Sequence, residues 1–256
     1  MHRLLVETRL LDEETPTLPA DAAKHLRVLR PKNGEEIELF DGKGKWRTYR
    51  FCASPASGGG AAASLRAQSD SRAIGRPNGS LTLFACVTKG SRWDWTVEKA
   101  TELGVTRIVP VISDRTIVRI PGGERAAKRE RWMRIAEDAA RQSDAKWLPE
   151  IREAVDFRDV LGLVRETTCF VGALTTPPPR PLAKAVAEAL AARGTGGRAD
   201  ASFAVFVGPE GDFTPEELNA LLEIAVPTSF GPTVLRAETA AIFAVSVLAS
   251  ARDLVR

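Results

Sequence analysis

Cysteine and histidine are scarce in this sequence of 256 residues. The three cysteines, Cys52, Cys86 and Cys169, are far apart and lack the CxxC spacing of a zinc or redox site. An odd number of scattered thiols does not form a disulfide framework, which favours a reducing, cytoplasmic setting. Only two histidines are present. A metal site is therefore not expected.

Long apolar runs are also missing. No stretch reaches the roughly 18 apolar residues that a membrane-spanning helix needs, and the N-terminus, MHRLLVETRLLDEE, meets acidic residues too early for a signal peptide. The hydrophobic share of 44% and the charged share of 27% are typical of a soluble globular protein. The net charge of +3 is compatible with a polyanionic partner but does not identify one.

Several motifs of common enzyme classes are absent. The sequence contains no GxGxxG, no GxxxxGK[ST], no HExxH and no GxSxG. These absences argue against a Rossmann dinucleotide site, a P-loop NTPase, a histidine-rich zinc site and an α/β-hydrolase.

The pattern of expected secondary structure changes near residue 72. Before it, short strands are expected at 2–7, 35–41, 45–53 and 64–70, with one short helix at 21–29, a pattern typical of a small β-barrel. The polar, Gly- and Pro-rich segment 71–80 is interpreted as a boundary between domains 1–72 and 73–256.

The second part alternates apolar strands with helices, which predicts an α/β fold with a mainly parallel sheet covered on both faces. The expected strands are 81–88, 107–112, 168–173, 203–207 and 226–230. The expected helices are 91–103, 124–142, 181–192, 215–224 and 238–252.

The segment VGPEGDFTPEEL, residues 207–218, follows an apolar strand and opens a helix. Thr214 is a good N-cap, Pro215 suits the first helical position, and Glu217 completes a capping box. The glycines on either side of Pro209 let the backbone pass close to a ligand at the carboxyl end of the strand. An ordinary tight turn between strand and helix is the alternative.

A second segment, FGPTVLRAETAA at 230–241, also leads from a strand into a helix. Arg236 precedes that helix, where the helix dipole does not favour a cation. Arg236 is a surface arginine, or it forms a structural salt bridge with Glu238, or it is held for an anionic or polarised ligand group.

Together these two segments closely resemble the RsmE family of the SPOUT superfamily. The similarity extends to KGSRWDWTVEKATELGV at 89–105, to residues 131–143 with Pro149-Glu150-Ile151, and to HLRVLR at 25–30 and LFDG at 39–42. The motifs stand in the family's order and span most of the chain.

The resemblance implies a SPOUT trefoil-knot methyltransferase domain preceded by a small PUA-like β-barrel domain that binds RNA. It implies methylation of uracil N3 in small-subunit (16S) ribosomal RNA by S-adenosylmethionine, in a homodimer with the last helix at its interface. It places the cofactor at three strand ends: Ala173, Leu174 and Thr175; Gly208, Pro209, Glu210 and Gly211; and Gly231 to Leu235.

The chemistry of N3 methylation assigns catalytic roles to two residues. Uracil N3 carries a proton, and its loss places negative charge on the ring carbonyls. Arg236 is the candidate cation for that charge, and Glu238, or Glu210, would take the proton or orient Arg236.

Eight basic residues are candidates for RNA contact. Lys43, Lys45 and Arg47 alternate along one expected strand and so share a face that Tyr49 continues, as suits an RNA backbone with unpaired bases. The others are His25, Arg27, Arg30, Lys89 and Arg92. A merely solvated surface is the alternative for each group.

Two other functions stay open. One is a SPOUT enzyme that methylates a ribose 2′-hydroxyl of tRNA or rRNA. The other is a catalytically inactive RNA-binding protein on the same fold. Binding of S-adenosylmethionine separates the second of these from an enzyme.

Overall fold

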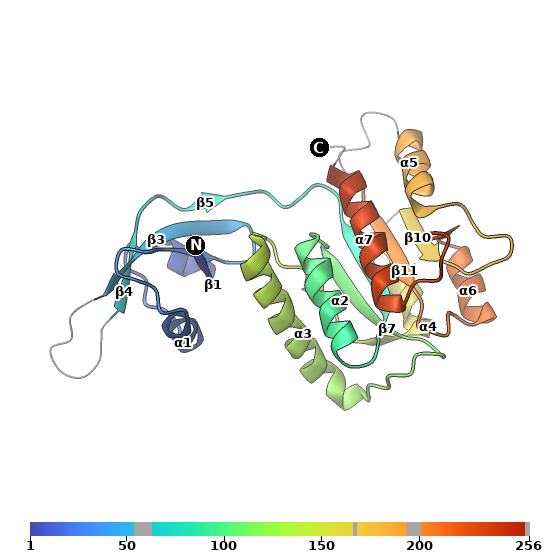
Figure 1. Ribbon diagram of the computed structural model, residues 1–256, viewed down its shortest axis with the longest axis horizontal. Helices are drawn as coiled ribbons and strands as arrows, with labels where there is room; N and C mark the ends of the chain where they lie inside the picture. Colours follow the sequence, from blue (N-terminus) through green and yellow to red (C-terminus); the bar gives the residue numbers. More distant parts are fainter. Residues whose placement is uncertain (54–62, 166–167, 194–200, 254–256) are drawn as a thin grey trace. The chain divides into compact units, whose positions relative to one another are not determined.

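The computed structural model describes residues 1–53, 63–165, 168–193 and 201–253 (Figure 1). The chain forms two compact units, which we call unit 1 (residues 1–76 and 140–148) and unit 2 (residues 77–139 and 149–256). Unit 1 therefore ends four residues after the boundary expected from the sequence. It also includes the segment 140–148, which the sequence analysis assigned to the second domain.

Unit 1 is built on a five-stranded sheet in the order β1-β2-β3-β4, with β5 paired to β3. β1 and β2 are parallel, whereas β2–β3, β3–β4 and β3–β5 are antiparallel. The strands are β1 (His2–Leu5), β2 (Glu36–Phe40), β3 (Lys45–Ala53), β4 (Ala63–Ala67) and β5 (Arg72–Ala73). A 3-10 helix, η1 (Thr8–Asp12), and helix α1 (Ala20–Leu29) complete the unit.

The segment 140–148 is fastened to this sheet by a buried ionic network. Glu38, only 3% exposed, accepts hydrogen bonds from Arg3 Nε at 2.7 Å and from Lys146 Nζ at 2.6 Å. Arg3 also donates to the carbonyl oxygen of Ala140 at 2.6 Å. Asp144 also pairs with Arg3 at 3.2 Å and with Lys146 at 2.7 Å, so two carboxylates offset the two cations, which makes the burial of Arg3 and Glu38 tolerable.

Unit 2 contains a seven-stranded sheet in which every pair of neighbouring strands is parallel. Its order is β12-β10-β11-β6-β7-β8, with β9 also paired to β7. The strands are β6 (Leu81–Cys86), β7 (Arg107–Ile112), β8 (Glu150–Ile151), β9 (Val155–Asp156), β10 (Thr168–Gly172), β11 (Phe203–Val207) and β12 (Val226–Thr228). The late strand β11 thus lies between β6 and β10, and β12 lies on the far side of β10.

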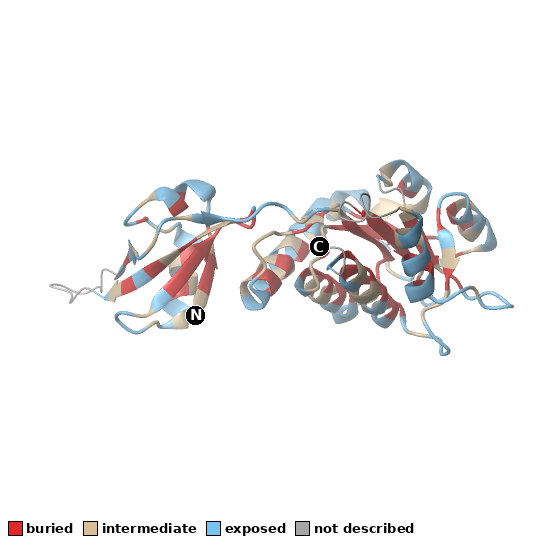
Figure 2. Ribbon diagram, turned by 90° about the horizontal axis from the view of Figure 1, so that it is seen from above, coloured by how far each residue is buried: buried red, intermediate tan, exposed pale blue. Residues whose placement is uncertain are grey.

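Helices cover both faces of this sheet (Figures 1 and 2). They are α2 (Ser91–Glu102), α3 (Gly122–Ser143), α4 (Phe157–Val160), η2 (Leu161–Leu163), α5 (Leu182–Ala192), α6 (Pro215–Leu222) and α7 (Ala237–Asp253). Alternate residues of β6 point to opposite faces: Leu83 packs in the cluster that includes α2, α3, α5 and α7, and Phe84 in the cluster that includes α4 and α6. Figure 2 shows the buried residues gathered on the strands and the helix faces toward them.

The expected fold class is confirmed: an α/β domain follows a smaller, strand-rich one. β3, β7 and β11 have the expected bounds. The segments β5, β8, β9 and α4 were not predicted, because two to four residues are too few to show a periodicity. Within the described ranges, no helix combines the length and apolarity that crossing a bilayer requires.

Candidate functional site

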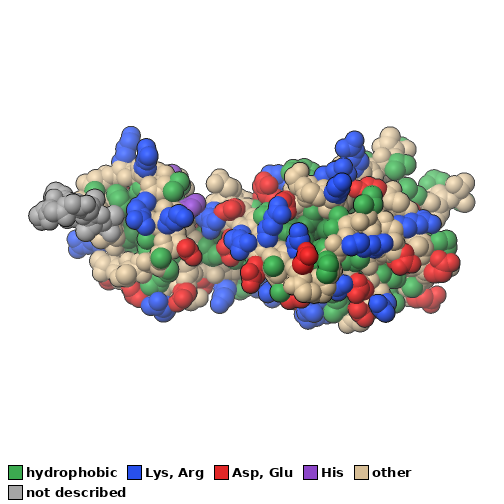
Figure 3. Space-filling model, turned by 90° about the horizontal axis from the view of Figure 1, so that it is seen from below, with side chains coloured by type: hydrophobic (Ala, Val, Ile, Leu, Met, Phe, Trp, Pro, Cys, Tyr) green, Lys and Arg blue, Asp and Glu red, His purple; other side chains and the backbone are tan. Residues whose placement is uncertain are grey.

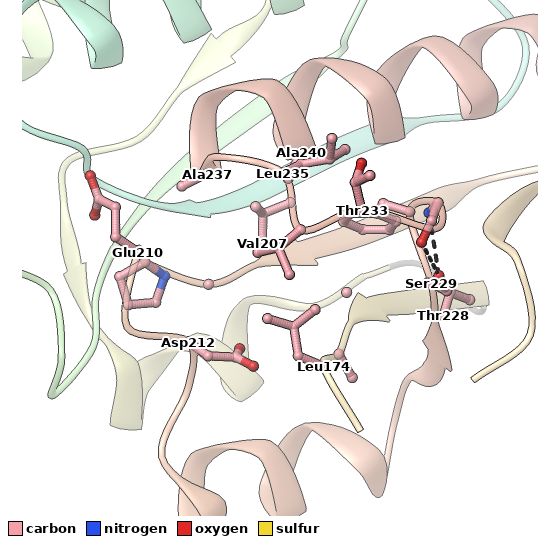
Figure 4. A pocket seen from close by; sticks show the side chains of 17 residues that line it. Leu174, Val207, Glu210, Asp212, Thr228, Ser229, Thr233, Leu235, Ala237 and Ala240 are labelled. Carbon is pink, nitrogen blue, oxygen red and sulfur yellow. Dashed lines mark hydrogen bonds between the residues drawn. The ribbon is translucent and has the colours of Figure 1, made fainter. Parts of the chain in front are cut away.

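A pocket opens in unit 2 where β10, β11 and β12 end (Figure 4). The segment that leads into α7 closes it from the other side, and it encloses about 640 Å³ of empty space, its open mouth included. Its lining residues are Gly172, Ala173, Leu174, Val207, Gly208, Pro209, Glu210, Asp212, Thr228, Ser229, Phe230, Gly231, Thr233, Val234, Leu235, Ala237 and Ala240. Parallel α/β sheets bind ligands at this end of their strands.

The loop between β11 and α6 is held rigidly. The capping box is present: Thr214 N donates to Glu217 Oε2 at 3.0 Å, and Glu217 N donates to Thr214 Oγ1 at 3.2 Å. Glu217 also accepts from the backbone N–H of Asp114 at 2.9 Å, and Arg115 donates to the carbonyl of Gly211 at 2.9 Å. The segment after β7 therefore fixes the loop that forms one wall of the pocket.

Two pocket glycines lie in close packing, more severely at Gly172 than at Gly208. A Cβ on Gly172 would lie 2.5 Å from Cε2 of Phe230, and a Cβ on Gly208 would lie 3.1 Å from Oδ1 of Asp212. The first distance is shorter than van der Waals contact allows, so a side chain at 172 would displace the ring of Phe230.

Apolar side chains line much of the pocket. Figure 4 shows Leu174, Val207 and Leu235 between Glu210 at one end and Thr233 at the other. Leu174 is 66% exposed, which is unusual for a leucine in a folded domain. An exposed apolar wall of this kind fits an aromatic ligand group such as adenine.

The charged groups of the pocket are all acidic. Among its described lining residues, only Glu210 and Asp212 carry charge, and both are carboxylates. Arg92, at the start of α2, approaches from outside and forms an ion pair with Glu210, with 3.1 Å between Nη1 and Oε1. The pocket wall therefore carries negative charge, which Arg92 partly offsets at Glu210.

Arg236 and Glu238 flank the point where α7 begins, beside pocket residues Leu235 and Ala237. Arg236 is exposed, and the structure records no ion pair between it and Glu238 within the described residues. Glu238 is half-buried, and its Oε2 is buried with no hydrogen-bond partner in the described part of the chain. The structural ion pair considered from the sequence is therefore not what holds Arg236.

Most residues that the sequence assigned to cofactor binding meet in the pocket. Thr175, Gly211 and Pro232 do not line it; the hydroxyl of Thr175 instead donates to the carbonyl of Pro177 at 2.9 Å. Those that line it are Ala173, Leu174, Gly208, Pro209, Glu210, Gly231, Thr233, Val234 and Leu235. Sequence reasoning missed Gly172, Val207, Asp212, Thr228, Ser229, Phe230, Ala237 and Ala240. The expected ends of three strands were the available signal for most of them.

The predicted basic strip on β3 is not an exposed RNA surface. Arg47 is 6% exposed, and its guanidinium donates to the carbonyl of Ser69 at 2.6 Å and pairs with Glu14. Tyr49, on the same face, is fully buried and donates to the carbonyl of Leu10 at 3.0 Å. Alternation showed correctly that these residues share a face, but this face is turned toward the core of unit 1.

The other predicted RNA contacts remain accessible to different degrees. Arg27, Arg30, Lys43, Lys89 and Arg92 are exposed, and His25 is half-exposed. Lys45 is 25% exposed and pairs with Asp12 at 2.6 Å. On the face drawn in Figure 3, Lys and Arg side chains are interspersed with Asp and Glu, so charge alone does not mark one RNA-binding surface.

No cluster of histidine, cysteine and acidic residues suited to a metal ion occurs within the described ranges. All three cysteines are free thiols. Burial raises the pKa of Cys86 to about 12, although hydrogen bonds with Ser113 and Thr116 oppose this shift. Cys86 therefore stays protonated at neutral pH and is not a nucleophile.

Family comparisons match both parts of the chain. Residues 76–249 match the family described as the RNA methyltransferase domain, and residues 18–51 match the RNA methyltransferase PUA domain. The first match covers all of the strand ends that form the pocket.

Individual relatives agree with these matches. The chain is 30% identical over 169 residues to the ribosomal RNA small subunit methyltransferase E of Bacillus subtilis, covering 66% of this chain and 64% of that protein. It is 30% identical to the protein of the same name from Mycobacterium bovis, covering 90% and 84%. The crystal structure of the Neisseria gonorrhoeae protein of that name, bound to S-adenosyl methionine, is 28% identical, with a TM-score of 0.79 and coverage of 98% and 97%.

Proposed function

The chain belongs to the RNA methyltransferase family of the ribosomal RNA small subunit methyltransferase E proteins, and on this basis we propose that it methylates N3 of a uracil in 16S ribosomal RNA. We propose S-adenosylmethionine as the methyl donor and the cytoplasm as the place of action. The observation that carries the proposal is the pocket at the ends of β10, β11 and β12, which combines apolar walls with two carboxylates. A relative with this fold binds S-adenosyl methionine in its crystal structure.

The pocket fits this donor in shape and charge. Leu174 and Leu235 would flank the adenine, and the backbone around Gly208 and Gly231 would reach its polar edge. When bound, S-adenosylmethionine supplies a methyl group on a positively charged sulfur, activated for direct transfer. The protein's part is to align the acceptor and exclude water.

Arg236 supplies the catalytic charge in this proposal. Loss of the N3 proton leaves negative charge on the uracil carbonyls, and an exposed guanidinium beside the pocket stabilises it. Glu238 takes the proton or orients Arg236. Its Oε2, buried and without a partner among the described residues, is a polar atom whose burial a functional contact would explain.

RNA reaches the site unpaired, because N3 is hidden within a base pair. The accessible residues proposed to contact it are His25, Arg27, Arg30, Lys43, Lys45, Lys89 and Arg92. The PUA-domain match supports unit 1 as the part that holds the RNA. Arg47 is left out of this set because the core of unit 1 uses it.

A homodimer is proposed with α7 at its interface. Phe243 on this helix is 38% exposed, and Ile242 and Val247 are only partly buried. A helix apolar on nearly all sides gains stability when a second surface covers its exposed part. Sedimentation of the purified protein tests this; a monomer at micromolar concentration contradicts it.

The decisive functional test replaces Arg236 with alanine. Arg236→Ala should abolish methyl transfer while the dissociation constant for S-adenosylmethionine stays close to that of the wild type. Arg158→Ala, at an exposed arginine on α4, is the matched control. Turnover at the wild-type rate in Arg236→Ala contradicts the assigned role.

Two further measurements separate the alternatives. Mapping the methylated nucleotide in rRNA from cells with and without the gene distinguishes uracil N3 from a ribose 2′-hydroxyl. Calorimetry with S-adenosylmethionine distinguishes an enzyme from an inactive RNA-binding protein, which would show no binding.

A further inference from the structure

The charge of the pocket has a specific arrangement. Glu210 lines the pocket and is paired across to Arg92 of α2, whereas the carboxylate of Asp212 accepts the N–H of Phe213 at 2.8 Å within its own loop. Both partners of the ion pair are partly exposed, Arg92 by 44% and Glu210 by 32% of the side chain. The guanidinium of Arg92 therefore lies outside the pocket, whereas the carboxylate of Glu210 lies at its wall.

This arrangement of charge matters because the donor and the product of methyl transfer differ in the charge on their sulfur. The donor, S-adenosylmethionine, has a positively charged sulfonium, whereas the product, S-adenosylhomocysteine, has a neutral thioether at the same place. The two share their adenosine and amino-acid parts, so apolar contacts and backbone hydrogen bonds distinguish them little. A carboxylate in the pocket wall distinguishes them by charge.

We propose that Glu210 makes the pocket prefer the cationic donor over the neutral product, and that Arg92 sets the strength of this preference by partly neutralising Glu210. The inference rests on the proposed function, because it takes the pocket to be the donor site. Glu210 acts as a specificity-determining residue and Arg92 as a residue that tunes it. The preference helps the product to leave after each transfer.

Replacing Glu210 and replacing Arg92 should change the affinity for the donor in opposite directions. Glu210→Gln keeps the size of the side chain and removes its charge, so the donor should bind more weakly while the product is little affected. Arg92→Gln leaves Glu210 uncompensated, so the donor should bind more tightly. For partly exposed charges we expect changes of roughly two- to fivefold in the ratio of the two dissociation constants.

The test is calorimetry of the full-length protein with S-adenosylmethionine and S-adenosylhomocysteine, without RNA. Four proteins are compared: wild type, Glu210→Gln, Arg92→Gln and the double variant. Glu223→Gln is the control for net charge, because Glu223 is exposed at the end of α6 and does not line the pocket. Each ratio is measured at about 0.05 M and about 0.5 M salt, since salt screens interactions between exposed charges.

Support requires a smaller preference for the donor in Glu210→Gln and a larger one in Arg92→Gln, with the double variant between these two. High salt should reduce both effects. Equal changes for donor and product, or a donor preference in Glu210→Gln that is unchanged or larger, would overturn the inference. If the wild type binds neither molecule, it is the proposed function that fails.

If Glu210→Gln does not fold, the ratio of the two dissociation constants in Arg92→Gln still tests the inference. An unchanged ratio in that variant overturns the inference, and an increased ratio that salt reduces supports it.

Discussion

Replacing Gly172 with alanine should distort the pocket and weaken the binding of S-adenosylmethionine, with only a modest loss of fold stability. A Cβ at position 172 would lie 2.5 Å from Cε2 and 2.7 Å from Cζ of Phe230. Ordinary contact between carbon atoms is about 3.5–4.0 Å, so the ring has to move by about 1 Å. Phe230 itself lines the pocket. The clash is therefore relieved by displacing a wall of the pocket.

The size of each effect follows from this geometry. Overpacking in a folded protein costs about 1–3 kcal/mol, and Phe230 is at the low end because it is only half-buried and can swing. If half of about 1 kcal/mol reappears as a distorted binding site, affinity for S-adenosylmethionine falls roughly twofold, since 1.4 kcal/mol corresponds to a factor of ten.

Calorimetry for binding and urea unfolding for stability measure the two effects separately. The double variant Gly172→Ala with Phe230→Leu removes the ring atoms that clash and should recover part of the lost affinity. Gly162→Ala is the control, because a Cβ there meets nothing within 4 Å. Wild-type affinity in Gly172→Ala, or a loss that Phe230→Leu does not relieve, would refute the reasoning.

Three other predictions concern stability and reactivity. Glu38→Ala should lower the free energy of unfolding by about 3 kcal/mol, measured by urea unfolding, because the buried Arg3 and the largely buried Lys146 lose a shared partner and keep only the exposed Asp144; a loss below about 1 kcal/mol contradicts this. At pH 8 an aromatic disulfide reagent should modify Cys52 alone, since Cys86 and Cys169 are buried and the raised pKa of Cys86 keeps its thiol protonated; rapid release of a second equivalent contradicts it. Thr214→Ala should cost about 1 kcal/mol of stability through the lost N-cap, and Thr214→Ser should restore most of it; equal stability of the two variants counts against the capping box.

Local interactions made part of the site predictable from the sequence. The capping box at Thr214 needs only residues within one helical turn, and it is present. The apolar strands that end at Gly172 and Val207 could be recognised because a buried parallel strand is a continuous apolar run. The glycines on either side of Pro209 marked one bend where a ligand could bind, whereas the full set of three strand ends came from the resemblance to the RsmE family.

Other features depend on which side of an element faces the core. The alternation of Lys45, Arg47 and Tyr49 shows that they share one face of β3, but a period of two does not say whether that face is solvated. The structure places Arg47 inside, where carbonyl groups distant in sequence accept its hydrogen bonds. In the same way, helical periodicity predicts α3 but not that residues 140–148 pack with the strands of unit 1.

The sequence by itself determined the order of the elements and the α/β fold class, because periodicity and capping act over a few residues; the three strand ends that form the pocket were implied by the resemblance to the RsmE family. Only the tertiary structure decided how those strand ends combine. It placed β11 between β6 and β10, and it brought Arg92 to Glu210, 118 positions away in the chain. Such contacts follow from the packing of the whole domain, so no local pattern encodes them. The apolar strand ends were thus foreseeable, whereas the charge arrangement of the pocket was not.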